Sequence, residues 1–92
     1  MNDPAESLDL LVGREVVIDT AAPYVILGRL AAWDEQLLVL EQADVHDLRD
    51  TTTTRENYIV DSLRHGIRIN RRRVLVARRD VVCLSALDEV IC

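Results

Sequence analysis

Two short apolar runs close to the C-terminus restrict most strongly what this chain can fold into. They are 74–77 (Val-Leu-Val-Ala) and 81–84 (Val-Val-Cys-Leu), and only Arg78-Arg79-Asp80 separates them. A hairpin with one face in water would alternate apolar and polar residues, whereas both runs are apolar on both faces. Because an exposed strand pair of this kind would aggregate, we expect both strands to be buried within a barrel or covered by another chain.

The preceding part of the chain has the pattern of a three-stranded meander. β-Branched residues favour a strand at about 14–20, and a longer strand at 24–33 precedes a polar turn at 34–36. Gly28 in the middle of the longer strand indicates a strong bend or a close backbone approach. A third strand begins at 37–40. Since only 3% of the residues are aromatic, the core must consist of Leu, Val, Ile and Ala.

A short amphipathic helix is predicted before these strands. Asp3 is a suitable N-cap, Pro4 occupies the first helical position, and Glu6 stands at the third, where a capping-box carboxylate belongs. Leucines then follow at helical spacing, and Gly13 occupies the usual stop position. The helix has one apolar stripe, so we expect it to lie on another element.

The region between the third strand and the apolar runs is mostly polar. Residues 44–54 have no hydrophobic period, which predicts a long surface loop. Thr53 or Thr54 can cap a second helix at 55–65, and Gly66 marks its end. We therefore expect a loop followed by one helix in this region.

The sequence offers little support for catalysis. It has no P-loop, Rossmann glycine pattern, CxxC, HExxH or nucleophile elbow. His46 with Asp44 and Asp47 could ligate a metal through a flexible loop, but such a cluster is far more often a solvated loop. We therefore predict no enzymatic activity, no cofactor and no metal site.

The composition indicates a globular chain of the cytoplasm. No stretch approaches the roughly 18 to 20 uninterrupted apolar residues of a membrane span, and the N-terminus lacks the features of a signal peptide. We accordingly expect no membrane partner. Cys83 lies within an apolar run and is interpreted as a small core residue, while a disulfide to Cys92 is not expected in a reducing compartment.

The charge is distributed unevenly along the chain. Residues 1–63 contain four Arg and thirteen acids, residues 64–79 contain seven Arg and no acid, and all eleven basic residues are Arg. Arg favours bidentate contacts to phosphate or carboxylate, although a GC-rich coding bias would give the same composition. The sequences 71–73 and 78–79 place five guanidinium groups within nine residues. This cluster indicates phosphate attraction, or else a solvated strand edge or a set of intersubunit salt bridges.

The order of elements and two short motifs resemble the Sm-like (Sm and LSm) family. Its first motif has a Gly, a Leu two positions later and an Asp six positions after the Gly, followed by a hydrophobic-Asn pair and a further Leu. The matching residues are Gly28, Leu30, Asp34, Leu37, Leu38 and Leu40, with Leu38 in place of the Asn. The second motif, an Ile-Arg-Gly turn before an apolar strand, resembles 76–81. The resemblance covers about residues 6–85, except for an insert at about 44–70.

The resemblance implies a fold and a mode of assembly. The fold is mainly β: one domain, 1–92, with an SH3-like, strongly bent five-stranded barrel, an N-terminal helix and a short helical insert between strands 3 and 4. The assembly is a cyclic homo-oligomer, a hexamer or heptamer, in which strand 74–77 of one copy pairs with strand 81–84 of the next. On this expectation the interface residues are Val74, Leu75, Val76, Val81, Val82 and Leu84.

Of the uridine pocket that the resemblance implies, this sequence retains only Asp34. The family places a stacking side chain, an Asn, an Arg and a Gly at the positions that are here Gln36, Leu38, Ala77 and Arg78. Without the ring and the amide, little remains to recognise a base.

The resemblance places Arg78 and Arg79 in the loop that faces the central pore of a ring, where they could bind the phosphates of single-stranded RNA. We therefore expect weak base preference. The candidate RNA-binding residues are Arg78, Arg79, Asp34, Gln36, Arg71, Arg72 and Arg73. The alternative is a structural or protein-interaction ring that does not bind RNA.

Overall fold

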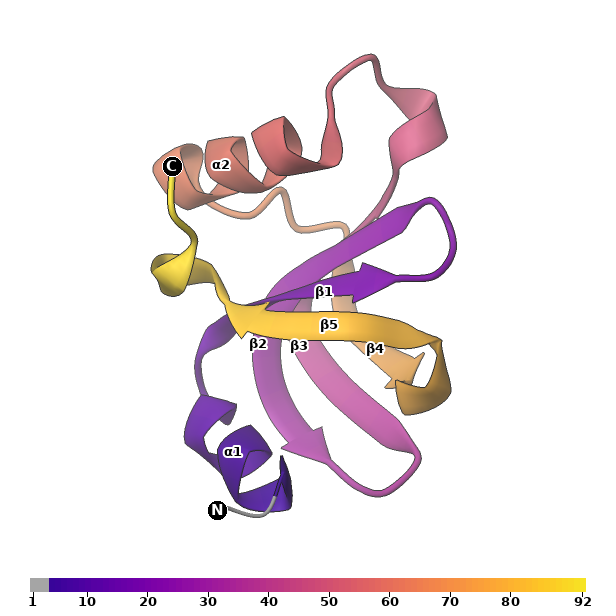
Figure 1. Cartoon of the computed structure of the whole chain (residues 1–92), viewed down its shortest axis with the longest axis vertical. Coiled ribbons are helices and arrows are strands. Elements are labelled where there is room, and N and C mark those ends of the chain that lie inside the picture. Colours follow the sequence, from indigo (N-terminus) through magenta and orange to yellow (C-terminus); the bar gives the residue numbers. More distant parts are fainter. Residues whose placement is uncertain (1–3) are drawn as a thin grey trace.

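The computed structural model describes residues 4–92, in which five β-strands form one bent sheet flanked by two α-helices (Figure 1). The N-cap expected at Asp3 lies outside the described residues. In chain order the elements are α1 (Pro4–Leu11), β1 (Glu15–Thr20), β2 (Tyr24–Trp33), β3 (Leu37–Asp47), α2 (Arg55–His65), β4 (Arg71–Ala77) and β5 (Val81–Ala86). Three short 3-10 helices follow β3, β4 and β5, namely η1 (Leu48–Asp50), η2 (Arg78–Asp80) and η3 (Leu87–Glu89).

The sheet is antiparallel throughout, in the order β4-β3-β2-β1-β5. Strands β4 and β5 are therefore its two edges. The long strands β2 and β3 bend together, and their register shifts near Gly28. A Cβ at Gly28 would lie 2.9 Å from the Cβ of Ala43 on β3, which confirms the close approach expected there. Only glycine allows the two strands to meet so closely.

The predicted strand at 24–33 and the predicted helix at 55–65 both agree with the structure. The Thr54 side chain caps α2 by accepting a hydrogen bond from the Asn57 N–H. The surface loop predicted at 44–54 is wrong at its beginning, because β3 continues to Asp47. Asp44 is compatible with a buried strand because its carboxylate accepts hydrogen bonds from two side chains, those of Tyr58 and Asn70.

Two apolar clusters lie on opposite faces of the sheet. The concave face carries Val16, Ile18, Ile26, Leu30, Leu38, Leu40, Ala43 and Val76, and α1 packs against it with Leu8 and Leu11. The convex face carries Val17, Val25 and Leu27, which pack with Tyr58 and Ile59 of α2 and with Leu87. Successive residues of a strand point to opposite faces. All three apolar residues 16–18 are buried because α2 covers the second face (Figure 1).

The two edge strands are only partly buried within this chain. Leu75 on β4 and Val82 on β5 are 57% and 68% exposed, so the barrel itself does not cover them. The interpretation of Cys83 as a core residue is wrong: its side chain is exposed and its Sγ donates to a carboxylate oxygen of Asp19 at 3.0 Å. Helix α2 covers β1 and β2 rather than this edge, so the apolar run at β5 is left without a layer above it. No helix within residues 4–92 combines the length and apolar character that a membrane crossing requires.

Candidate functional sites

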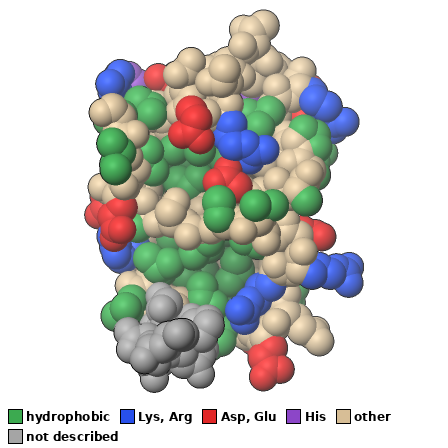
Figure 2. Space-filling model, viewed as in Figure 1, with side chains coloured by type: hydrophobic (Ala, Val, Ile, Leu, Met, Phe, Trp, Pro, Cys, Tyr) green, Lys and Arg blue, Asp and Glu red, His purple; other side chains and the backbone are tan. Residues whose placement is uncertain are grey.

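An apolar groove of about 600 Å³ runs beside the edge strand β4. It lies between β4 and the turn that joins β1 to β2. Its floor and walls are formed largely by apolar side chains of three strands, which include Ile26, Val45, Val74, Leu75 and Val76. Figure 2 shows further apolar surface on both sides of β5, the opposite edge strand. The groove and the edges thus present apolar surface together with unpaired backbone groups.

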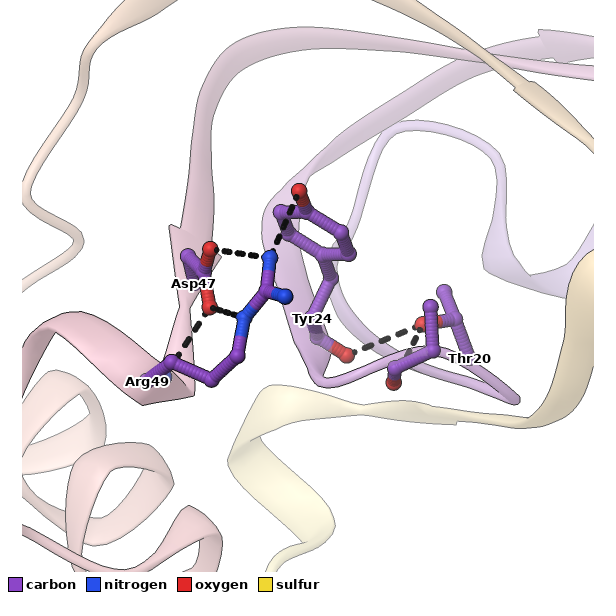
Figure 3. Close-up of polar contacts among 5 residues, drawn as sticks. Thr20, Tyr24, Asp47 and Arg49 are labelled. Carbon is purple, nitrogen blue, oxygen red and sulfur yellow. Dashed lines mark hydrogen bonds and ion pairs between the residues drawn. The ribbon is translucent and has the colours of Figure 1, made fainter.

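The end of this groove is held in place by polar contacts around Tyr24 (Figure 3). The Thr20 hydroxyl donates to the backbone oxygen of Tyr24 at 3.1 Å. From η1, Arg49 lies 5.9 Å from the centre of the Tyr24 ring and forms an ion pair of 2.8 Å with Asp47. The hydrogen bonds from Arg49 lower the pKa of Asp47 to about 2. This wall of the groove is therefore fixed by contacts within the chain itself.

The predicted interface residues have three different environments. Leu75 and Val82 are exposed and available to a partner, whereas Val74, Val81 and Leu84 are half-buried against the core of their own chain. Val76 is buried at 5% exposure. Its side chain belongs to the core, so it can take part in strand pairing only through its backbone.

The β2–β3 turn and the β4–β5 turn are joined to each other. One carboxylate oxygen of Asp34 accepts hydrogen bonds from the backbone N–H groups of Gln36 and Leu37, both at 2.7 Å. These bonds lower the pKa of Asp34. The Arg78 guanidinium donates to the backbone oxygen of Asp34 at 2.7 Å and lies 5.8 Å from the centre of the Trp33 ring. The Arg78 N–H also donates to the backbone oxygen of Gln36. Asp34, Gln36 and Arg78 thus form one structural unit.

Arg79 differs from Arg78 in its surroundings. It is exposed, and within residues 4–92 it forms no ion pair. It lines a cavity of about 420 Å³ together with Glu35, Gln36, Leu37 and Ala77. Leu38, which stands in place of the family's Asn, is 3% exposed and belongs to the core. Neither Arg78 nor Arg79 pairs with a described carboxylate, but Arg79 is the more exposed of the two and its guanidinium has no hydrogen-bond partner among the described residues. Leu38 offers no group to a base.

The five arginines of 71–73 and 78–79 do not form one cluster. Arg71 begins β4 and Arg78 follows its end, so that a strand of seven residues, roughly 20 Å long, separates the two groups. Arg73 lies 3.6 Å from a carboxylate oxygen of Glu41, whose other oxygen pairs with Arg29 at 2.8 Å. The turn and the beginning of β4 are two separate basic regions.

Several residues around these regions were not singled out from the sequence. Trp33 supports Arg78, and Arg64 and Arg68 extend the basic region before β4. The acid-free stretch 64–79 is the sequence feature that could have pointed to Arg64 and Arg68. The Trp33–Arg78 contact joins residues too far apart in the chain to leave a local pattern. Among residues 4–92, no group of three or more His, Cys, Asp and Glu side chains is placed to hold a metal ion.

Comparisons with known proteins identify the fold. No family model matches the sequence, and no curated protein matches it. Among solved structures, the Pyrococcus abyssii Sm protein in complex with a uridine heptamer superposes with a TM-score of 0.64, at 14% identity, over 92% of this chain and 99% of that one. A heptameric archaeal Sm protein gives a TM-score of 0.59 at 20% identity, over 88% and 96% of the two chains. The fold is Sm-like.

The Sm-like domain is also similar to a chain of another assembly. A chain in the crystal structure of the NatC complex bound to Gag peptide and CoA gives a TM-score of 0.55 at 19% identity, over 84% of this chain and 86% of that one. The expected architecture is thereby confirmed: a mainly β, strongly bent five-stranded sheet with an N-terminal helix and a helical insert between β3 and β4.

Proposed function

We propose that this Sm-like domain assembles with copies of itself into a closed ring of six or seven subunits, and that the ring binds single-stranded RNA mainly through phosphate contacts. The observation that carries the proposal is the pair of open sheet edges. Strands β4 and β5 end the sheet, and each exposes an apolar side chain, Leu75 or Val82.

Pairing β4 of one copy with β5 of the next would satisfy both edges at once. The unpaired N–H and C=O groups would continue the antiparallel ladder, and a closed ring would leave no free edge. Burying one exposed Val or Leu side chain contributes about 1.5–3 kcal/mol. The groove beside β4 offers apolar surface to the incoming strand. The open edges thus favour association with a second copy.

The RNA contact is assigned to the turn that carries Arg79. In a ring this turn would be repeated in every subunit, so that one free guanidinium per copy attracts the phosphate backbone. Arg78 and Asp34 join the two turns, so that the Arg78 guanidinium already has one hydrogen-bond partner within the chain. Because Leu38 is buried and no aromatic side chain stands at Gln36, base preference would be weak. The solved complex of the Pyrococcus abyssii Sm protein with a uridine heptamer supports this choice of ligand.

Two measurements test the proposal. Light scattering gives the mass of the assembly, and a monomer at tens of micromolar would contradict the ring. Fluorescence anisotropy with labelled single-stranded RNA at about 50 and 200 mM salt gives the affinity and its salt dependence. Arg79→Gln should weaken binding and reduce the salt slope. Arg14→Gln is the matched control, because it removes the same charge from an arginine that pairs with Asp88 and Glu89, and it should leave the affinity unchanged.

A structural or protein-interaction ring is the second candidate. It is favoured by the engagement of Arg78 within its own chain, by the burial of Leu38, and by the similarity to a chain of the NatC complex. An intact ring that binds no RNA at low salt would establish this second candidate in place of the first.

A further inference from the structure

The basic region before β4 has no role in the turn that carries Arg79. Residues 64–73 contain five arginines and no acid, and they run from the end of α2 into the beginning of β4. Three of these arginines, Arg64, Arg68 and Arg71, are called the insert arginines. All three are exposed.

No carboxylate among the side chains that the structure describes, those of residues 8–92, pairs with the insert arginines, and the same holds for Arg72, Arg78 and Arg79. The chain has sixteen acids, and the structure pairs five of its arginines with them: Arg14, Arg29, Arg49, Arg55 and Arg73. A solvated or structural role explains those five. The insert arginines instead keep their charge available to a ligand.

The backbone between Arg68 and Arg71 is held to the sheet by Asn70. Its N–H donates to the backbone oxygen of Ala43 at 2.8 Å, and its side-chain oxygen accepts from the Val45 N–H at 3.0 Å. Its amide nitrogen donates to the buried carboxylate of Asp44 at 3.0 Å. A ligand would therefore meet a segment that is already ordered, which lowers the entropic cost of binding.

Two side chains are also positioned by their neighbours. Arg68 lies 5.4 Å from the centre of the Tyr58 ring, and Arg71 donates to the backbone oxygen of Asn70 at 3.0 Å. Neither contact neutralises the positive charge. Consecutive insert arginines are three or four residues apart, so their backbones are separated by at most about 14 Å. Ile69, which is 54% exposed, lies between Arg68 and Arg71 and adds apolar surface.

We propose that the insert arginines form a second phosphate-binding surface, for the backbone of single-stranded RNA, separate from the turn that carries Arg79. The proposal rests on the proposed function, because it takes RNA as the ligand. Strand β4 places the two surfaces roughly 20 Å apart. One RNA of sufficient length can therefore contact both, and the second contact becomes intramolecular, which raises the overall affinity without any new recognition of bases.

The length of the RNA separates the two surfaces experimentally. Anisotropy would be measured with an oligonucleotide of about 6 nucleotides and with one of about 30 nucleotides. The triple variant Arg64→Gln/Arg68→Gln/Arg71→Gln should bind the long RNA about tenfold more weakly and the short RNA as well as wild type. Its salt slope for the long RNA should fall by about 0.7 for each phosphate that the variant can no longer neutralise. Arg79→Gln should weaken the binding of both the short and the long RNA.

A neighbouring residue provides the matched control. Arg72 is exposed and carries the same charge as Arg71, but successive residues of a strand point to opposite faces. Arg71→Gln should therefore weaken binding of the long RNA clearly more than Arg72→Gln. Circular dichroism and thermal melting would show that each variant keeps the fold.

Four outcomes overturn the proposal. If the triple variant binds the long RNA like wild type while Arg79→Gln binds it weakly, the second surface is wrong and the proposed function stands. Equal effects of Arg71→Gln and Arg72→Gln would indicate that the net charge of the protein, and not a defined surface, determines the affinity. If polyglutamate at equal charge displaces the RNA from the insert arginines as well as unlabelled RNA does, the surface is one for acidic protein. Absence of any RNA binding by wild type would contradict both the surface and the proposed function.

Discussion

The hydroxyl of Tyr58 on α2 donates a hydrogen bond to the carboxylate of Asp44 on β3. Asp44 is only 1% exposed. The same carboxylate accepts from Asn70, so one acid joins the helix, a central strand and the segment before β4. The His46 ring stacks on Tyr58 with 3.8 Å between the ring centres and 9° between the planes. The helical insert is therefore attached to the sheet by a specific polar contact as well as by apolar packing.

Removal of the Tyr58 hydroxyl should destabilise the fold. Tyr58→Phe keeps the packing of the ring but deprives the buried Asp44 carboxylate of one donor, which costs about 1–3 kcal/mol. Urea unfolding followed by circular dichroism would measure the change. Tyr24→Phe is the control, since the Tyr24 hydroxyl makes only a 3.5 Å contact with Arg49. An equal loss in the two variants would contradict a special role for the Asp44 contact.

The stability of the wild type should fall in strong alkali in a way that depends on Tyr58. Burial and the Asp44 hydrogen bond raise the pKa of Tyr58 from 10.0 to about 12. A raised pKa contributes stability that is fully present below pH 10 and is lost as the pH rises to about 12. The difference in unfolding free energy between wild type and Tyr58→Phe should therefore narrow across this window. A constant difference would show that Tyr58 titrates normally in the folded protein.

The bend of the sheet should depend on the missing side chain at Gly28. Gly28→Ala would place a methyl group 2.9 Å from the Ala43 Cβ and 3.2 Å from a Leu40 methyl group. We expect a loss of about 1–3 kcal/mol, typical of overpacking in a core, measured by chemical unfolding. Ala43→Gly removes one of the clashing groups, so Gly28→Ala/Ala43→Gly should be more stable than the sum of the two single changes predicts. Simple additivity would argue against this contact.

The oligomer should depend on Val82. Val82→Asp places a charge on the exposed edge of β5 and should dissociate the assembly, as judged from the mass by light scattering. Leu10→Asp is the matched control, since Leu10 is an apolar residue of α1 with 72% exposure and belongs to neither edge strand. If Val82→Asp keeps the mass of the wild type, the proposed pairing of β4 with β5 is wrong.

The turn that follows β2 should become less stable without the Asp34 carboxylate. Asp34→Ala removes the acceptor of two backbone N–H groups and should lower the melting temperature at neutral pH. Because these bonds lower the pKa of Asp34, their contribution is present above the ordinary value of 3.8 and is lost as the pH falls below it. The difference in melting temperature should accordingly shrink in acid. Asp34→Asn retains a hydrogen-bond acceptor, so its melting temperature should lie between those of wild type and Asp34→Ala.

The parts of the fold that were predictable carry local markers. Strand β2 lies between the turns that contain Pro23 and Asp34, and α2 lies between Thr54 and Gly66. The second half of β3 was missed because Asp44 breaks the apolar pattern, and its partners lie 14 and 26 residues further along the chain. A pattern within a short window contains no information about those partners.

The same limit applied to the candidate sites. The apolar character of β4 and β5 predicted that these strands need cover, and the structure places them at the two edges of the sheet. The exposure of Cys83 depends on where α2 ends its coverage of the sheet. The contact between Arg78 and Asp34 joins residues 44 positions apart. Their charges were visible in the sequence, whereas the geometry that gives Arg78 a backbone partner and leaves Arg79 exposed was not.

The cover that α2 provides over the convex face has an evolutionary consequence. Val17, Val25 and Leu27 would lose a large part of their cover if the insert were shortened to a tight turn, because Tyr58 and Ile59 pack on them together with Leu87. We therefore expect descendants or ancestors that lack the helix to carry more polar residues at these three positions. The insert and the outward residues of the first two strands should be gained and lost together, as a single inherited unit, even though the chain separates them by about thirty residues.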